Sequence, residues 1–315
     1  MSEARRHLLA IADLERADVQ RLLDAARAFD GSTAKLPLLR GSSVVNLFYE
    51  SSTRTLASFE LAAKRLSADT TSVRAAGSSV DKGESLKDTI LTLSAYDPDV
   101  IVVRHPSIGA AQLVTSWTGA QVVNAGDGKH EHPTQALLDL YAIREELGEI
   151  EGLHVAIVGD VLHSRVARSN IWGLTKLGAQ VGVCGPHTLM PRGIEELGVK
   201  FFPRIEEAIE WADVLNVLRL QLERMEKGFI PSLREYYRVW GVTPERLERS
   251  PRPITIMHPG PMNRGVEIDS RVADGPHSVI LDQVTNGVAV RMAVLYLLAG
   301  GRPELADAAK RGGAE

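Results

Sequence analysis

Two uninterrupted runs of apolar, mostly β-branched residues constrain the fold of this chain most strongly. They are Val100-Ile101-Val102-Val103 and Val155-Ala156-Ile157-Val158, and neither offers a polar residue to solvent on either face. Such runs suit parallel strands that helices bury on both sides, whereas a strand with one wet face alternates polar and apolar residues. Each run stands between stretches with helical periodicity. The chain is therefore predicted to be an α/β protein built on parallel sheets.

The alternation of strands and helices continues along the rest of the chain. Further strands are expected at 43–49, 70–74, 122–124, 181–184, 214–218 and 254–257. Helices are expected at 8–30, 53–66, 85–96, 110–118, 133–147, 168–177, 205–211 and 288–298. This order predicts two doubly wound parallel-sheet domains with the active site in the cleft between them. We expect residues 1–148, completed by a C-terminal helix at 285–312, to form the first domain, and 149–284 the second.

The length of the chain limits its number of domains, and its net charge limits the classes of partner that it can bind. The chain has 315 residues, enough for two domains of about 150 residues each. A net charge of -4 gives no general attraction to nucleic acids or acidic membranes. No apolar run is long enough to span a bilayer, and no secretory apolar core follows Met1. The only cysteine, Cys184, excludes an intramolecular disulfide and a cysteine-rich zinc site. A cytoplasmic protein without nucleic-acid or membrane partners is expected.

Polar residues follow the expected strands at the point where each strand ends. In open parallel sheets, ligands bind at these carboxyl ends. The candidates are Ser52 to Thr55, Arg104, His132, Gln135, Arg165, Arg219, Gln221, Gly260 and Pro261. Four arginines lie among them with few acids between. A single arginine is usually a solvated surface residue, but four in one topological position predict a pocket for a substrate with several negative charges.

The stretch Ser51 to Thr55 stands between a strand and an amphipathic helix, and it has two possible interpretations. Hydroxyl residues ahead of a helix are favoured N-caps, since their oxygens accept from unpaired backbone N–H groups. The same N–H groups and the helix dipole attract anions, and Arg54 adds a planar fork that suits phosphate. The stretch is either a phosphate cradle or an ordinary capped helix with one solvated arginine.

The histidines at 130 and 132 also have more than one interpretation. His130-Glu131-His132 could indicate a metal, but residues two apart at a helix start diverge, and no further ligand set accompanies them. A helix N-terminus should disfavour the imidazolium form of His132, so that a neutral ring donates one hydrogen bond to a carbonyl oxygen. The structural alternative is an N-cap histidine. Residues 126–129 and 158–160 lack the spacings of a Walker loop and a dinucleotide fingerprint, so a nicotinamide cofactor is not expected.

No nucleophile is evident in the chain. Ser52 has no neighbouring base in sequence, and Cys184 ends a buried strand, where thiols are usually inert. A site rich in cations and hydrogen-bond donors, without nucleophile or metal, suits direct transfer between two bound substrates. Positioning and the stabilisation of developing charge would accelerate such a transfer.

Four segments together resemble the carbamoyltransferases. They are Phe48 to Thr55, Arg104-His105-Pro106, His132-Pro133-Thr134-Gln135 and His258-Pro259-Gly260-Pro261. The resemblance extends from about residue 7 to residue 299 and is closest to the catalytic chains of the aspartate-specific branch. Ornithine-specific members have His-Pro-Cys-Gln and His-Cys-Leu-Pro segments, whereas this chain has Thr134 and Gly260 there. The segment Arg219-Leu220-Gln221 also resembles the Arg-x-Gln of the aspartate-specific members.

The resemblance implies transfer of a carbamoyl group from carbamoyl phosphate to L-aspartate, an early step of pyrimidine synthesis, without metal or cofactor. It implies carbamoyl phosphate ligands at Ser52, Thr53, Arg54, Thr55, Arg104, His132, Gln135, Gly260 and Pro261. It implies aspartate ligands at Lys82, Arg165, Arg219 and Gln221. Direct catalytic roles would fall to Arg54, Thr55, Lys82, Arg104 and His132.

The resemblance also implies a homotrimer in which Ser78 and Lys82 reach the site of a neighbouring subunit. It leaves open a larger assembly with a regulatory chain or with dihydroorotase. Some members have Tyr-Gly-Arg-Thr where this chain has His163 to Val166, so the turn around Arg165 could position it differently. The segment 223–240 is expected to close over aspartate. Ornithine or an acylated ornithine as acceptor, and a non-catalytic scaffold that binds anions, are the alternatives.

Overall fold

The computed structural model describes residues 7–75, 83–222 and 228–301. Ser78, Lys82 and part of the expected closing segment lie outside the described residues. Contacts divide the chain into two compact units, one of Met1–Tyr141 with Thr285–Glu315 and one of Ala142–Val284. The division falls within helix α5 (Pro133–Leu147), whereas we expected it after residue 148. None of the described helices has the length and apolar character needed to cross a membrane.

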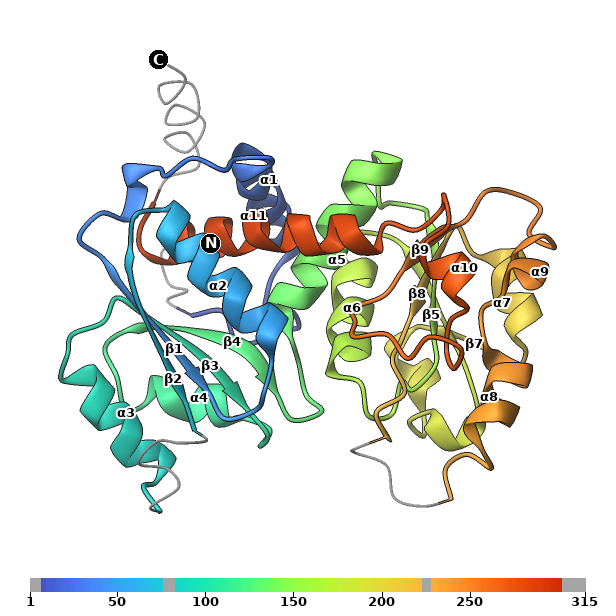
Figure 1. Ribbon diagram of the computed structural model, residues 1–315, viewed down its shortest axis with the longest axis horizontal. Helices are drawn as coiled ribbons and strands as arrows, with labels where there is room; N and C mark the ends of the chain where they lie inside the picture. Colours follow the sequence, from blue (N-terminus) through green and yellow to red (C-terminus); the bar gives the residue numbers. More distant parts are fainter. Residues whose placement is uncertain (1–6, 76–82, 223–227, 302–315) are drawn as a thin grey trace. The chain divides into compact units, whose positions relative to one another are not determined.

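The first unit contains a four-stranded parallel sheet in the order β2-β1-β3-β4 (Figure 1). Its strands are β1 (Ser43–Phe48), β2 (Asp69–Arg74), β3 (Val100–His105) and β4 (Gln121–Asp127). Its helices are α1 (Arg16–Phe29), α2 (Thr53–Arg65), α3 (Leu86–Ser94), α4 (Ala110–Thr115), η1 (Pro37–Leu39), most of α5 and most of α11 (Ile280–Leu298). The apolar run at the start of β3 is fully buried, as its continuous pattern predicted.

Helices α3 and α4 cover one face of this sheet. Ile90 and Leu93 on α3, with Val114 on α4, pack against the inward side chains of β1 and β3, including Leu47 and Val103. Burial of these β-branched and leucine side chains supplies the main stabilisation of the unit, at about 1.5–3 kcal/mol for each large side chain. The sheet is therefore a rigid base for the loops at its carboxyl edge.

The second unit contains a five-stranded parallel sheet in the order β7-β6-β5-β8-β9 (Figure 1). Its strands are β5 (His154–Val158), β6 (Gln180–Cys184), β7 (Lys200–Phe202), β8 (Val214–Val217) and β9 (Thr255–Met257). Its helices are α6 (Arg165–Lys176), α7 (Ile205–Trp211), α8 (Leu233–Trp240), α9 (Pro244–Leu247), α10 (Ser270–Ala273), η3 (His187–Leu189) and η4 (Ile194–Leu197). The prediction of two parallel-sheet α/β domains is confirmed.

Several boundaries differ from those expected from sequence. Helix α6 begins at Arg165 rather than Arg168, because the Ser164 side chain caps it by accepting from the Ala167 N–H at 3.1 Å. Helix α11 begins at Ile280 rather than at residue 288. Its first turns hold buried Gln283, which accepts from the backbone N–H of His258, so a tertiary contact outweighs a weak helical pattern. The edge strand β7 is too short for a pattern to be recognised.

Strand order reverses once in each sheet. In the first unit β1 has β2 on one side and β3 on the other, and in the second unit β5 has β6 and β8. Loops that leave adjacent strands at such a point diverge, and ligands of doubly wound folds bind there. In register, Phe48 of β1 is paired with Arg104 of β3, and Val158 of β5 with Val217 of β8. In each unit, most of the candidate site residues lie at or just after the ends of the two strands between which the strand order reverses.

Candidate functional site

The first group of candidates lies at the N-terminus of α2. Ser52 is the N-cap residue, but its side chain makes no capping hydrogen bond. Thr53 and Arg54 are exposed, and Thr55 is buried in the first turn. Because Ser52 does not cap the helix, its hydroxyl is not committed to the helix. This geometry favours the phosphate-cradle interpretation over that of an ordinary capped helix.

A buried cation, Arg291, strengthens the positive potential near this turn. Arg291, on α11, lies with its guanidinium 5.2 Å from the centre of the Phe59 ring of α2. Burial lowers the pKa of Arg291 to about 10, the Asp139 carboxylate opposes this shift, and the charge of Arg54 adds to it. Desolvation also lowers the pKa of Arg54. Two mutually repelling cations beside a helix N-terminus would be stabilised by an anion with more than one charge.

Arg104 lies on the neighbouring strand, where its contacts include Ala125 and Glu50. Its Nη1 donates to the backbone oxygen of Ala125 at 3.3 Å, and its Nε lies 3.5 Å from Glu50 Oε2. Both contacts hold the guanidinium at the end of β3. The same strand-end position brings Arg104 beside the residues that follow β1, because Phe48 and Arg104 are paired in the sheet.

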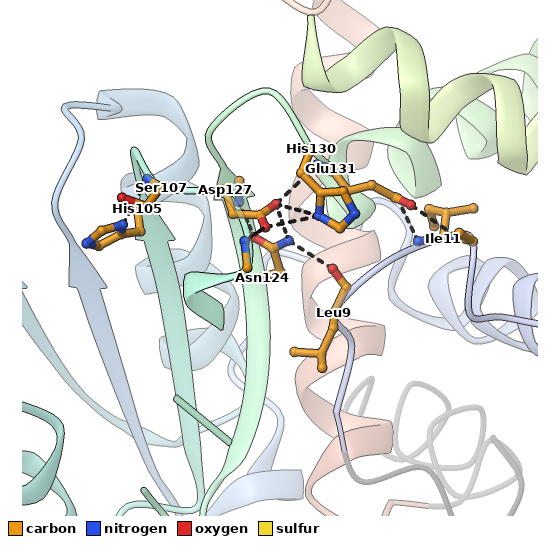
Figure 2. Close-up of polar contacts among 11 residues, drawn as sticks. Leu9, Ile11, His105, Ser107, Asn124, Asp127, His130 and Glu131 are labelled. Carbon is orange, nitrogen blue, oxygen red and sulfur yellow. Dashed lines mark hydrogen bonds and ion pairs between the residues drawn. The ribbon is translucent and has the colours of Figure 1, made fainter. Parts of the chain in front are cut away.

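A polar network fixes the loop between β4 and α5 (Figure 2). Asp127 accepts from the side chain of Asn124 at 2.8 Å and from the N–H of Glu131 at 3.1 Å, and it lies 3.0 Å from His130 Nδ1. Asn124 Nδ2 also donates to the backbone oxygen of Leu9 at 2.8 Å. Asp127 further accepts from the Gly109 N–H at 2.8 Å, which ties the loop after β4 to the one after β3.

Glu131 connects this loop to the N-terminal segment. Its carboxylate accepts from the N–H groups of Ile11 at 2.7 Å and Ala12 at 3.2 Å (Figure 2). The metal interpretation of residues 130–132 is therefore replaced by a structural one, because Glu131 and His130 are engaged in this network. Among the residues the structure describes, no three His, Cys, Asp or Glu side chains are arranged to hold a metal ion.

His132 and Gln135 start the helix that follows. His132 is buried immediately before α5, and its backbone oxygen accepts from the N–H of Gln135 at 2.9 Å. The Gln135 side chain donates through Nε2 to Asp139 at 2.9 Å. Both residues belong to the first unit together with the α2 turn and Arg104. The neutral state of His132 stays a prediction.

Replacing Glu131 with glutamine tests the network beneath His132. One oxygen that accepts from a backbone N–H becomes a donor, so the free energy of unfolding should fall by about 1–3 kcal/mol. Urea denaturation at neutral pH measures the change. Glu146→Gln, at an exposed position on α5, is the matched control and should leave stability within about 0.5 kcal/mol. Equal stability of both variants would contradict the assignment.

The second group of candidates is organised by the buried carboxylate of Asp160, just after β5. Its Oδ1 accepts from the His163 N–H at 3.1 Å and lies 2.9 Å from His163 Nδ1. Its Oδ2 accepts from the Gln221 N–H at 3.4 Å. One carboxylate thus joins the turn that carries buried Arg165 to the loop after β8 that carries Arg219.

A glycine allows the two loops of the second unit to approach. Gly159 has a φ of +124°, and a Cβ there would lie 3.0 Å from the backbone oxygen of Leu218. Any side chain would separate the turn after β5 from the segment after β8. The close approach brings the residues around Arg165 and those around Arg219 to one end of the second sheet.

Gly260 and Pro261 follow β9 in the second unit. The Gly260 N–H donates to His258 Nδ1 at 2.7 Å, so Nδ1 is unprotonated and Nε2 carries the hydrogen. That Nε2 lies 3.2 Å from the buried carboxylate of Glu267, which also accepts from the Asn263 N–H at 2.5 Å. The histidine and the glutamate therefore hold the conformation of the segment after β9.

The structure thus places the candidates in two groups, one in each unit. Ser52 to Thr55, Arg104, His132 and Gln135 belong to the first, and Arg165, Arg219, Gln221, Gly260 and Pro261 to the second. Sequence reasoning did not find the buried carboxylates that hold them, namely Asp127, Asp139, Asp160 and Glu267. For Asp127 and Asp160 the available signal was their position at or just after a strand end, but only their hydrogen bonds distinguish them from solvated acids. Asp139, within α5, and Glu267 gave no such signal.

The two units are doubly wound parallel α/β domains, each with arginines at or after the ends of the strands where its strand order reverses. This arrangement defines a class of proteins suited to anionic ligands. Residues 6–145 match the family model of the aspartate/ornithine carbamoyltransferase carbamoyl-P binding domain. Residues 151–298 match the model of the Asp/Orn binding domain of the same family. The chain belongs to the aspartate/ornithine carbamoyltransferase family.

Relatives within the family are similar over nearly the full length. The aspartate carbamoyltransferase catalytic subunit of Gemmatimonas aurantiaca is 63% identical, with 97% of both chains covered. That of Desulforamulus reducens is 58% identical over 94% of this chain and 96% of its own. The Trypanosoma cruzi aspartate transcarbamoylase in complex with carbamoyl phosphate and aspartate is 31% identical, with a TM-score of 0.83 over 92% of this chain and 95% of its own. The catalytic subunit of M. jannaschii aspartate transcarbamoylase is 38% identical, with a TM-score of 0.81 over 93% and 97%.

Proposed function

We propose that this protein is an aspartate carbamoyltransferase, which forms N-carbamoyl-L-aspartate and phosphate in pyrimidine synthesis. The observation that carries the proposal is the 63% identity over 97% of the chain to an aspartate carbamoyltransferase catalytic subunit. A relative of the same fold was solved with carbamoyl phosphate and aspartate together. In this chain, Thr134, Gly260 and the Arg219-Leu220-Gln221 segment agree with aspartate as the acceptor.

The first unit would bind carbamoyl phosphate. The uncapped N-terminus of α2, with Ser52 to Thr55, holds the phosphate, and Arg104 bridges phosphate and carbonyl oxygen. Thr55 and His132 polarise the carbonyl. Gln135 holds the carbamoyl amide. Gly260 and Pro261, which belong to the second unit, are further carbamoyl phosphate ligands that the family resemblance implies.

The second unit would bind the acceptor. Arg165 and Arg219, assisted by Gln221, bind the two carboxylates of aspartate, and the Asp160 carboxylate keeps their loops together. Lys82, outside the described residues, is the further ligand that the family resemblance implies. Residues 223–240 would close over the bound aspartate.

The chemistry is a direct substitution at the carbonyl carbon. The neutral α-amine of aspartate attacks, and the carbonyl π electrons move to the oxygen, where Thr55, Arg104 and His132 stabilise the negative charge. The C–O bond to phosphate then breaks, the carbonyl re-forms, and the departing phosphate accepts the amine proton. Arg54 stabilises the charge that accumulates on this leaving group. No covalent enzyme intermediate is needed.

One assay tests the function. Purified protein is incubated with carbamoyl phosphate and either L-aspartate, ornithine or an acylated ornithine, and the carbamoylated product is identified by mass spectrometry. We expect product with aspartate alone. Product with an ornithine alone would overturn the acceptor assignment, and no product with any acceptor would favour a non-catalytic anion-binding scaffold.

The oligomeric part of the proposal is a homotrimer with sites shared between subunits, through Ser78 and Lys82. Arg54→Ala and Lys82→Ala should each be inactive alone. If a site takes Arg54 from one subunit and Lys82 from its neighbour, mixed oligomers should regain part of the activity, because some sites contain both intact residues. Absence of any recovery after the two variants are dissociated and reassembled together would argue against shared sites. Sedimentation of the protein from its native source tests a larger assembly with a regulatory chain or dihydroorotase.

A further inference from the structure

The amide of Gln135 is oriented by a buried carboxylate one helical turn further along α5. Its Nε2 donates to Asp139 Oδ1 at 2.9 Å, and Asp139 is only 1% exposed. An ionised carboxylate accepts hydrogen bonds and donates none. The NH₂ end of Gln135 must therefore face Asp139. The opposite end of the amide, the Oε1 acceptor, is left to face any ligand.

Arg291 is a buried cation whose charge interacts with that of Asp139. Its guanidinium is buried against the Phe59 ring, and its Nη1 donates to the backbone oxygen of Gly287 at 3.0 Å. Burial lowers the pKa of Arg291 to about 10, and the Asp139 charge opposes that shift. Since about 10 lies well above neutral pH, Arg291 stays cationic. A buried cation favours the ionised form of a neighbouring carboxylate.

We propose that Asp139 is a positioning residue that selects the amide of the carbamoyl donor. By holding Gln135 Nε2, it presents Oε1 to the ligand, and an acceptor at that point matches the N–H donors of a carbamoyl group. A donor with a methyl group in place of the amide leaves the Oε1 acceptor without a hydrogen bond. The inference rests on the proposed function, in which Gln135 holds the carbamoyl amide.

The test compares carbamoyl phosphate with acetyl phosphate, which has a CH₃ group where carbamoyl phosphate has NH₂. Their dissociation constants are measured by equilibrium competition, with inorganic phosphate as a third ligand that lacks the acyl group. The unmodified protein should bind carbamoyl phosphate about tenfold more tightly than acetyl phosphate. In Asp139→Asn the side chain can donate as well as accept, so Gln135 can turn over. The ratio of the dissociation constant for acetyl phosphate to that for carbamoyl phosphate should then fall about fivefold. The affinity for inorganic phosphate should stay within about twofold of that of the unmodified protein.

The variants Gln135→Leu and Gln135→Leu/Asp139→Asn complete a double-mutant cycle with Asp139→Asn and the unmodified protein. Without the amide, Asp139→Asn should no longer change the ratio, because its effect acts through Gln135. A ratio near one in the unmodified protein would overturn the proposal even if Asp139→Asn failed to fold. An unchanged ratio in Asp139→Asn would also overturn it, as would a parallel loss of inorganic phosphate binding, which indicates a general structural role.

A separate measurement tests the proposed function. N-carbamoyl-L-aspartate is measured with the unmodified protein, whereas the binding ratios need no acceptor. Absence of product with a clear carbamoyl preference would contradict the function but not the orienting role of Asp139. Product formation with no carbamoyl preference would contradict the orienting role alone.

Discussion

Arg54→Ala should lower kcat by about a thousandfold. The substitution removes the cation assigned to the leaving phosphate, and loss of one preorganised group that stabilises developing charge costs about that much. The side chain is exposed at the first turn of α2, so the thermal midpoint should change little. The measurement is steady-state formation of N-carbamoyl-L-aspartate at saturating aspartate, together with a thermal unfolding curve.

Lys64→Ala is the matched control for Arg54. Lys64 is an exposed cation in the last turn of the same helix, so its loss changes the net charge equally without touching the N-terminus of α2. It should keep activity within about twofold. An Arg54→Ala variant that retained a tenth of the activity, or a Lys64→Ala variant that lost as much, would contradict the phosphate cradle.

Arg219→Ala should raise the KM for aspartate by about a hundredfold. A guanidinium that binds a carboxylate contributes hydrogen bonds between charged groups, and their loss reduces affinity by one to two powers of ten. The dissociation constant for carbamoyl phosphate should stay nearly unchanged, because the phosphate ligands belong to the other unit. Initial rates over a series of aspartate concentrations separate KM from kcat.

Arg204→Ala controls for the loss of a cation in the same unit. Arg204 is exposed and lies 3.8 Å from Glu207 on the surface of α7, where such pairs contribute little. Its substitution should leave both kinetic constants unchanged. A weaker carbamoyl phosphate complex in Arg219→Ala, with KM for aspartate unaltered, would move Arg219 out of the acceptor site.

Local patterns of apolar and polar residues were sufficient to predict most of the helices and strands. The continuous run at Val100 to Val103 is a fully buried strand, as expected, because only burial on both faces suits such a sequence. Boundaries were less predictable where tertiary contacts decide them. Gln283 lies within α11 although its neighbours do not show a clear helical stripe, since it accepts from His258 in the folded chain.

The candidate site was predicted unevenly. Residues at strand ends, such as Arg104 and Arg165, could be found because topology places strand ends at one edge of a sheet. The sequence allows two interpretations of Ser52. The structure, in which its side chain makes no capping hydrogen bond, favours the phosphate cradle, which stays a prediction. Asp160 escaped notice, because its hydrogen bonds reach Gln221, a residue far along the chain.

By itself, the sequence determined the fold class, the parallel sheets and the chemical types of the candidate ligand-binding groups. These follow from local periodicity and from residues that carry their own chemistry, such as the arginines and the Ser52 to Thr55 turn. Only the tertiary structure decided how those groups are held. The Gln135 amide donates to Asp139 on the same helix, and Arg291, whose charge interacts with that of Asp139, comes from the far end of the chain. Hydrogen bonds and charge interactions between distant residues depend on distance in space, which no local pattern records.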